Sequence, residues 1–207
     1  MHNPDLIVHH VETREALLAV DPGTLARARL VAFATAVIVP TAVLTGLGFG
    51  AYNFHPGPPT HPGWAPACFA VYDRAPLFGA TAPRMTEEVD DGPIVGTQLF
   101  AVGKEMTPAQ LERQALRAML VLFRQLGALL ARQTQPLPIL PICWGSPRRR
   151  RADFDRLSQI TSDLSADERQ RRQQAFGSAP SPGAEGRFSP VGSVSADGGS
   201  PLGQLRN

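Results

Sequence analysis

The stretch from residue 30 to residue 57, LVAFATAVIVPTAVLTGLGFGAYNFHPG, decides the fold. Residues 30–50 carry no charge, and the run is as long as a membrane-spanning helix needs to be. A continuous helix is disfavoured because Pro40 interrupts the run and several glycines lie at its end. Unbroken apolar runs are typical of parallel strands that are covered on both faces. We therefore expect a buried strand at residues 30–35, a turn at Val39 and Pro40, a short helix, and a strand that ends at residues 52–54.

Strand and helix patterns also alternate on both sides of this stretch, which is typical of the α/β class. The expected elements are a strand at 5–11, a helix at 13–20, a rigid proline-rich loop at 56–66, a helix at 68–72, extended segments at 79–85 and 96–102 around an acidic turn at 86–93, a helix that begins at Thr107 with apolar residues in helical period up to Leu130, and a polar helix that begins at Ser165. Pro83 favours an edge position for its strand, and the polar helix has little apolar surface to bury. From Gly177 onward Ser, Pro and Gly dominate, as in disordered segments.

Composition excludes several function classes. The 207 residues carry a net charge of only +2, with 43% hydrophobic and 18% charged residues, which disfavours a dedicated nucleic-acid binder. Cys68 and Cys143 are far apart and are expected to be small buried apolar residues, so neither a disulfide scaffold nor a zinc site is predicted. The first residues lack the pattern of a secretory signal, and a cytoplasmic location without membrane attachment is expected.

Polar residues that suit acyl transfer lie next to the second strand. Asn53 and His55 are alternate residues at a strand end and are expected to point to the same side. Asp90 lies in the acidic turn, whose path Gly92 and Pro93 restrict. An amide, an imidazole and a carboxylate can together stabilise an oxyanion, move a proton and orient the imidazole. Spacing alone does not show that the three side chains meet.

Three separated motifs resemble those of a known family. They are Asn53-Phe54-His55-Pro56-Gly57-Pro58-Pro59, then Phe78-Gly79-Ala80-Thr81, then Val89-Asp90-Asp91-Gly92-Pro93-Ile94. In this order they resemble the catalytic core of the folate-dependent formyltransferases, which include methionyl-tRNA formyltransferase and sugar N-formyltransferases. The resemblance spans residues 28–177. It implies a three-layer, Rossmann-like α/β domain with a mostly parallel sheet over residues 1–144, a polar helical extension over 145–176 and a low-complexity tail over 177–207. Compared with the family, an initial βα unit is expected to be missing.

The resemblance also implies an activity, a formyl donor and site residues. It implies transfer of a formyl group from 10-formyltetrahydrofolate to a primary amine, with Asn53, His55 and Asp90 as catalytic residues. Contacts to the folate are implied for a second set of positions, namely Phe33, Thr35, Pro40, Glu88 and Val89. The acceptor is expected to be a small or nucleotide-linked amine rather than a tRNA, because the family's C-terminal nucleic-acid-binding barrel has no counterpart here. A homodimer is left open, and no metal is expected.

Two other functions remain as alternatives. The chain could be a catalytically idle or folate-binding interaction protein that pairs through an exposed sheet edge, or it could hydrolyse 10-formyltetrahydrofolate.

Other signals have simpler interpretations. The basic run at residues 148–151 is expected to be a solvated turn rather than a phosphate site, the pair His9 and His10 lacks further metal ligands, His61 is expected to be exposed, and Trp64 is expected to pack the proline-rich loop.

Overall fold

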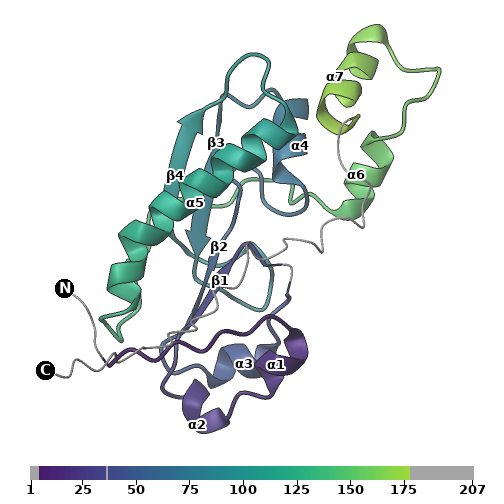
Figure 1. Ribbon diagram of the computed structural model, residues 1–207. Coiled ribbons are helices and arrows are strands. Elements are labelled where there is room, and N and C mark those ends of the chain that lie inside the picture. Colours follow the sequence, from purple (N-terminus) through teal and green to yellow (C-terminus); the bar gives the residue numbers. More distant parts are fainter. Residues whose placement is uncertain (1–4, 36, 178–207) are drawn as a thin grey trace, which may run out of the picture.

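The computed structural model describes residues 5–35 and 37–177, and the predicted low-complexity tail after Gly177 lies outside them. Its centre is a pair of parallel strands, β1 (Leu30–Phe33) and β2 (Ala51–Phe54), in a register that joins Leu30 to Ala51 and Phe33 to Phe54. Helix α3 (Thr41–Gly46) connects them (Figure 1). The strand, turn, helix and strand expected over residues 30–54 are therefore confirmed.

A hairpin continues this framework. Strands β3 (Leu77–Pro83) and β4 (Ile94–Ala101) pair antiparallel, and β3 also meets β2 through the bridges His55–Thr81 and Tyr52–Arg84. The edge position expected for Pro83 is wrong, since its strand lies between β2 and β4. A register shift between Ala82 and Pro83 accommodates the proline, which has no N–H to donate.

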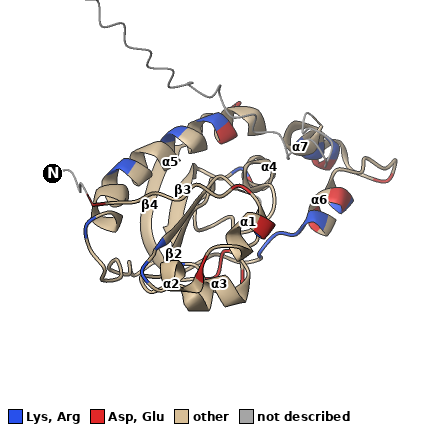
Figure 2. Ribbon diagram, turned by 60° about the horizontal axis from the view of Figure 1, so that its bottom comes forward, with Lys and Arg blue, Asp and Glu red and all other residues tan. Residues whose placement is uncertain are grey.

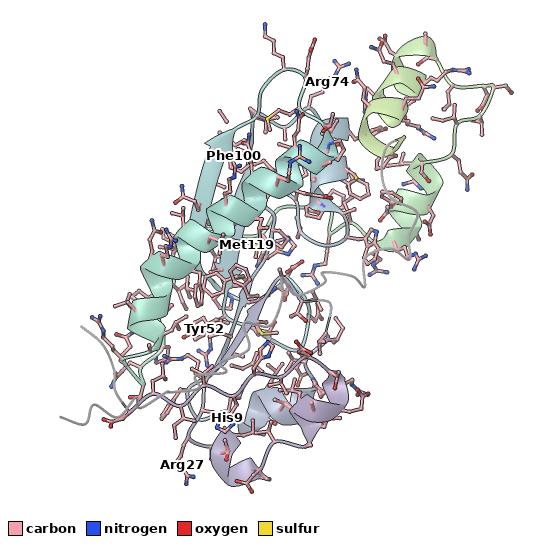
Figure 3. The ribbon with its side chains drawn as sticks, viewed as in Figure 1. His9, Arg27, Tyr52, Arg74, Phe100 and Met119 are labelled. Atoms are coloured by element: carbon pink, nitrogen blue, oxygen red, sulfur yellow. The ribbon has the colours of Figure 1, made fainter. Side chains whose placement is uncertain are left out.

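Helix α5 (Pro108–Leu130) covers β3 and β4. Its start is the predicted capping box. The backbone N–H of Gln110 donates to Thr107 Oγ1 (3.3 Å), and the backbone N–H of Thr107 donates to Gln110 Oε1 (2.8 Å). Met119 of this helix and Tyr52 of β2 are both buried in the core beneath it (Figure 3). The helix thereby packs against the buried face of the strands, through residues such as Tyr52 and Phe54 of β2.

Three helices form a separate apolar cluster beside this core: α4 (Pro66–Tyr72), α6 (Arg151–Leu157) and α7 (Ala166–Phe176). The Phe176 ring packs edge-on against Phe69 at 5.5 Å and Phe154 at 5.3 Å. The sequence did not predict α6. The expectation that α7 has little to bury is wrong at its last turn, where Ala175 and Phe176 are buried.

The N-terminal prediction is also wrong. Residues 5–12 form no strand, and Leu6, Ile7 and Val8 are 50%, 78% and 78% exposed. Apolar residues form a strand only where a neighbouring strand supplies hydrogen bonds, and none of the described strands pairs with this segment. The predicted helix shortens to α1 (Arg14–Leu18), and the unpredicted α2 (Pro22–Leu25) follows. In the described part of the chain, no helix is long and apolar enough to cross a membrane.

Candidate active site

The end of β2 brings Asn53 and His55 to one side of the strand. Phe54, between them, is fully buried in the core, so its two neighbours lie on the opposite side. The His55 backbone is fixed by two hydrogen bonds to Thr81, His55 N–H to Thr81 O (2.9 Å) and Thr81 N–H to His55 O (3.0 Å). Asn53 is half-buried, whereas His55 is buried.

Asp90 meets His55 as the sequence suggested. Its Oδ1 atom lies 3.5 Å from His55 Nδ1, and its Oδ2 atom accepts a hydrogen bond from the Gly63 N–H (3.1 Å). The acidic loop, residues 86–92, turns sharply at this point, with Asp90 at a left-handed φ of +50°. A loop after β3 and a loop after β2 thus place a carboxylate against an imidazole.

Burial governs the charge of this pair. Loss of solvation lowers the pKa of His55, and the opposing effect of the Asp90 carboxylate is the smaller one. The imidazole is therefore neutral near pH 7. Two polar atoms of the pair, His55 Nε2 and Asp90 Oδ1, are buried and have no hydrogen-bond partner among the described residues. A buried polar atom without a hydrogen bond lowers the stability of the folded protein unless a bound ligand supplies the missing hydrogen bond.

Gly57 allows the His55 ring to lie where it does. A Cβ atom on Gly57 would lie 2.6 Å from His55 Nε2 and 3.0 Å from His55 Cδ2. The carbonyl oxygen of Gly57 accepts a hydrogen bond from the buried Thr81 hydroxyl (2.7 Å), which fixes the backbone at this distance. The glycine of the Asn53-to-Gly57 motif thus leaves the space that the histidine occupies.

The five positions implied for folate contact do not all face solvent. The Phe33 ring packs against Phe54 and Phe123 at 5.9 and 5.6 Å, on the core side, so the ring serves the core. Thr35 is exposed, with its hydroxyl oxygen accepting the Val37 N–H (3.1 Å), and Pro40 is the residue before α3. Glu88 and Val89 lie in the acidic loop beside Asp90, and both side chains are exposed.

Two residues near the pair were not predicted as site residues. The Trp144 ring lies edge-on to the His55 ring at 6.1 Å, and its Nε1–H donates to the Gly92 carbonyl (2.9 Å). Arg148 donates to Glu88 and to the Asp90 carbonyl. The solvated turn expected at 148–151 is therefore wrong for Arg148 and also for Arg149, which packs over the Phe69 ring at 4.9 Å. The available signal was a basic run that could pair with the acidic run at 87–91.

Two other expectations differ from the structure. The His61 side chain is 11% exposed rather than solvated, with Nε2 lying 3.5 Å from Asp73 Oδ2. Cys68 is buried, but Cys143 is exposed, and neither forms a disulfide within the described part of the chain. His9 lies at the end of the molecule that carries α1 to α3 (Figure 3). Over residues 5–35 and 37–177, no three metal-binding side chains are grouped together.

A cavity of about 310 Å³ opens elsewhere, at the start of β2. Gly50, Arg84 and Thr134 are among its lining residues, and none of the predicted site residues is. This cavity is therefore distinct from the His55–Asp90 pair.

Comparison with known proteins supports the resemblance. No protein-family model matches the chain. Methionyl-tRNA formyltransferase of Methylococcus capsulatus is 34% identical over 101 residues, which cover 48% of this chain and 31% of that protein. The sugar N-formyltransferase of Shewanella sp. FDAARGOS_354 superposes with a TM-score of 0.63 at 19% identity, covering 75% of this chain and 63% of that one. An N-formyltransferase of Helicobacter canadensis, solved with folinic acid and dTDP-3-aminofucose, superposes with a TM-score of 0.55 at 18% identity, covering 69% and 52%.

The chain thus spans about a third of the curated relative and less than two thirds of these two structures. Within that span, the expected α/β fold of the formyltransferase type is confirmed. The sequence match to a methionyl-tRNA formyltransferase likewise confirms the resemblance to the folate-dependent formyltransferases.

Proposed function

We propose that this chain transfers a formyl group from 10-formyltetrahydrofolate to a primary amine. The observation that carries the proposal is the buried His55–Asp90 pair at the end of β2, whose atoms Nε2 and Oδ1 have no hydrogen-bond partner within residues 5–35 and 37–177. The formyltransferase fold and the sequence match favour formyl transfer over other acyl-transfer reactions. Asn53, His55 and Asp90 are the proposed catalytic residues.

The residues available suit each requirement of the reaction. The bound folate would supply an activated formyl carbon: the acceptor nitrogen bonds to it, its bond to the folate nitrogen breaks, and the amine proton ends on that nitrogen. The Asn53 amide can donate a hydrogen bond to the formyl oxygen as negative charge develops there. Removing one such donor in a water-excluded site costs on the order of 3 kcal/mol of transition-state stabilisation.

His55 is suited to handle the proton. Because burial lowers its pKa, the ring is neutral near pH 7 and one nitrogen is free to accept a proton. Asp90 faces Nδ1, which leaves Nε2 directed to the reacting groups and stabilises the imidazolium when it forms. Asp90 thus orients the His55 ring, partly offsets the effect of burial on its pKa, and assists removal of the amine proton.

The folate contacts and the acceptor class belong to the same proposal. Main-chain groups near Phe33, Thr35 and Pro40, together with Glu88 and Val89, would receive the pterin. The folinic acid bound by the Helicobacter canadensis protein supports a reduced folate as donor, and its aminosugar nucleotide supports a nucleotide-linked amine as acceptor. A tRNA acceptor has the weaker support, because the match to the methionyl-tRNA enzyme covers only 31% of that protein.

The first experiment measures both binding and transfer. The purified chain is titrated calorimetrically with a stable 10-formyltetrahydrofolate analogue, then assayed with the natural donor and a panel of aminosugar nucleotides, with free formate measured to detect hydrolysis. We expect micromolar binding and a formylated amine, and a loss of about 100- to 1,000-fold in kcat for Asn53→Ala and for His55→Ala. His61→Gln is the control and should retain activity.

Two results would contradict the proposal. One is a folded wild-type chain that does not bind the analogue, which would favour the interaction-protein alternative. The other is wild-type turnover in either active-site variant. Formate release without an amide product would instead identify the hydrolase alternative.

A further inference from the structure

The conformation of the acidic loop, residues 86–92, is unfavourable for two reasons, its charge and its backbone geometry at Asp90. Glu87, Glu88, Asp90 and Asp91 place four carboxylates within five residues, and like charges this close repel one another. Asp90 is nevertheless buried, and its left-handed φ of +50° is unfavourable for a residue with a Cβ atom. Interactions from outside the loop are needed to keep Asp90 against His55.

Arg148 supplies such interactions through one guanidinium group. Its Nη1 donates to Glu88 Oε2 (3.3 Å), and its Nη2 donates to the Asp90 carbonyl oxygen (3.2 Å) and pairs with the Asp91 carboxylate. The side chain is 34% exposed. Because the planar group bonds several oxygens at fixed angles, it both offsets the repulsion and fixes the Asp90 backbone.

Trp144 holds the next turn of the same loop. Its Nε1–H donates to the Gly92 carbonyl, two residues after Asp90, at 2.9 Å. The same ring lies edge-on to His55. The segment from 144 to 148 therefore contacts both members of the catalytic pair, the acidic loop by hydrogen bonds and the histidine by ring packing.

The 144–148 segment is itself anchored to the proline-rich loop. The Gly145 N–H donates to Pro59 O (2.8 Å), and the N–H of the following Arg149 donates to Pro62 O (3.1 Å). That loop in turn donates to Asp90, through the Gly63 N–H to Oδ2. The three segments thus form a closed set of hydrogen bonds around the carboxylate.

We propose that Arg148 and Trp144 are positioning residues, which fix Asp90 relative to His55. The inference rests on the proposed function, in which Asp90 acts on the imidazole. Neither residue touches the reacting groups. Arg148 acts through the backbone and neighbours of Asp90, and Trp144 acts through Gly92. The segment that the sequence assigned to an extension beyond residue 144 would therefore belong to the catalytic machinery.

A spectroscopic test needs no substrate. Because the Asp90 carboxylate faces Nδ1, it favours the His55 tautomer with the proton on Nδ1, and long-range ¹H–¹⁵N spectra report which nitrogen carries it. We expect Arg148→Met and Trp144→Phe to shift His55 toward the Nε2–H tautomer, in the direction of Asp90→Asn. Arg148→Lys, which keeps the charge, should shift it less. Arg156→Met, which removes an exposed arginine paired on its own helix, is the control and should cause no shift.

Kinetics give the second readout. If formyl transfer is found, Arg148→Met should lower kcat by about 100-fold, as displacement of a catalytic group by an ångström does, with partial rescue in Arg148→Lys. Folded Arg148→Met and Trp144→Phe proteins with the wild-type tautomer would overturn the inference, as would an unchanged kcat. If the wild type transfers no formyl group, the proposed function fails, and the tautomer experiment still decides the positioning role.

Discussion

The space around the His55 ring depends on a single hydrogen atom at Gly57. A methyl group there would lie 2.6 Å from Nε2 and 3.0 Å from both His55 Cδ2 and Pro66 Cβ. Gly57 has an ordinary backbone conformation, so the conflict is with the histidine and the proline and not with the φ angle. The chemistry proposed for His55 therefore depends on a residue with no functional group.

Gly57→Ala should displace the imidazole while the fold survives. We expect the free energy of unfolding to fall by about 1–3 kcal/mol, since the new methyl overpacks a buried site. The kcat for formyl transfer should fall about 100-fold, because the ring moves by a sizeable fraction of an ångström. Urea unfolding and steady-state kinetics measure the two effects.

The matched control is Gly127→Ala in α5. There the new Cβ would make only ordinary contacts, the nearest being 3.6 Å from Phe123, and alanine is the better helix former. This variant should gain up to about 1 kcal/mol of stability and retain kcat. Equal effects of the two substitutions would show that the His55 ring does not depend on Gly57.

At the scale of elements, Arg29 joins the end of α5 to the start of the parallel pair. Its guanidinium donates to Phe49 O (3.0 Å), to Leu130 O (2.6 Å) and to Gln133 O (2.7 Å). It also donates to the carbonyls of residues 134 and 135 and lies over the Tyr52 ring at 5.5 Å. Leu130 lies in the last turn of α5, whose carbonyls have no partner within the helix, and no basic residue lies in that turn. The other four carbonyls lie outside the helix, at residue 49 and at residues 133–135.

Arg29→Met should therefore destabilise the fold by about 2–4 kcal/mol, since several carbonyls lose a charged donor. Arg29→Lys should recover only part of this loss, because one ammonium group cannot reach the same set of oxygens. Urea unfolding measures both. Arg113→Met, on the exposed side of α5 where basic residues lie along the helix (Figure 2), is the control and should stay within about 0.5 kcal/mol of wild type. A loss below 1 kcal/mol for Arg29→Met would refute this role for Arg29.

The elements that the sequence predicted well have strong local patterns. Helix α5 has a capping box and a long apolar period, and the uncharged run at residues 30–54 has the composition of buried strands. The strand expected at residues 5–11 has a similar local pattern but no neighbour to pair with, which local sequence cannot reveal. The basic run that precedes helix α6 masked its pattern, and its apolar residues, Phe154 and Leu157, are buried in a cluster with residues of α4 and α7, which lie elsewhere in the sequence.

For the whole molecule, the candidate site lies where segments distant in sequence converge. The sequence predicts Asn53, His55 and Asp90 as candidates because Asn53 and His55 lie at the end of a strand and all three belong to motifs that resemble a known family, and the structure brings His55 and Asp90 together. Trp144 and Arg148 could not, since their bonds to the acidic loop cross more than 50 residues and depend on the path taken after α5 (Figure 1). The sequence motifs therefore point to the candidate chemical groups, whereas the structure shows which distant residues, such as Trp144 and Arg148, contact the loop that carries Asp90.

Buried His55 and partly buried His61 also make the stability of the whole molecule depend on pH. Burial is the main cause that lowers the pKa values of His55 and His61, and Asp90 and Asp73 only partly oppose it. In the unfolded chain both rings bind a proton near pH 6.5. Below that pH the unfolded state binds more protons than the folded state, until the pH falls to the folded-state pKa values, so the free energy of unfolding decreases as the solution is acidified.

We therefore expect urea unfolding at pH 7.5, 6.5 and 5.5 to give a steadily falling free energy of unfolding. Carboxylates whose pKa values are lowered in the fold, such as those of Asp153 and Glu168, lose their contribution only at lower pH, so the histidines dominate this range. His61→Gln should make the dependence shallower, because one of the two rings is removed. His10→Gln, which changes an 82% exposed side chain, should leave the wild-type dependence in place. A free energy that is constant or rises between pH 7.5 and 5.5 would mean that the folded protein accommodates protonated histidines at these positions, and the neutral His55 on which the proposed proton transfer depends would have to be abandoned.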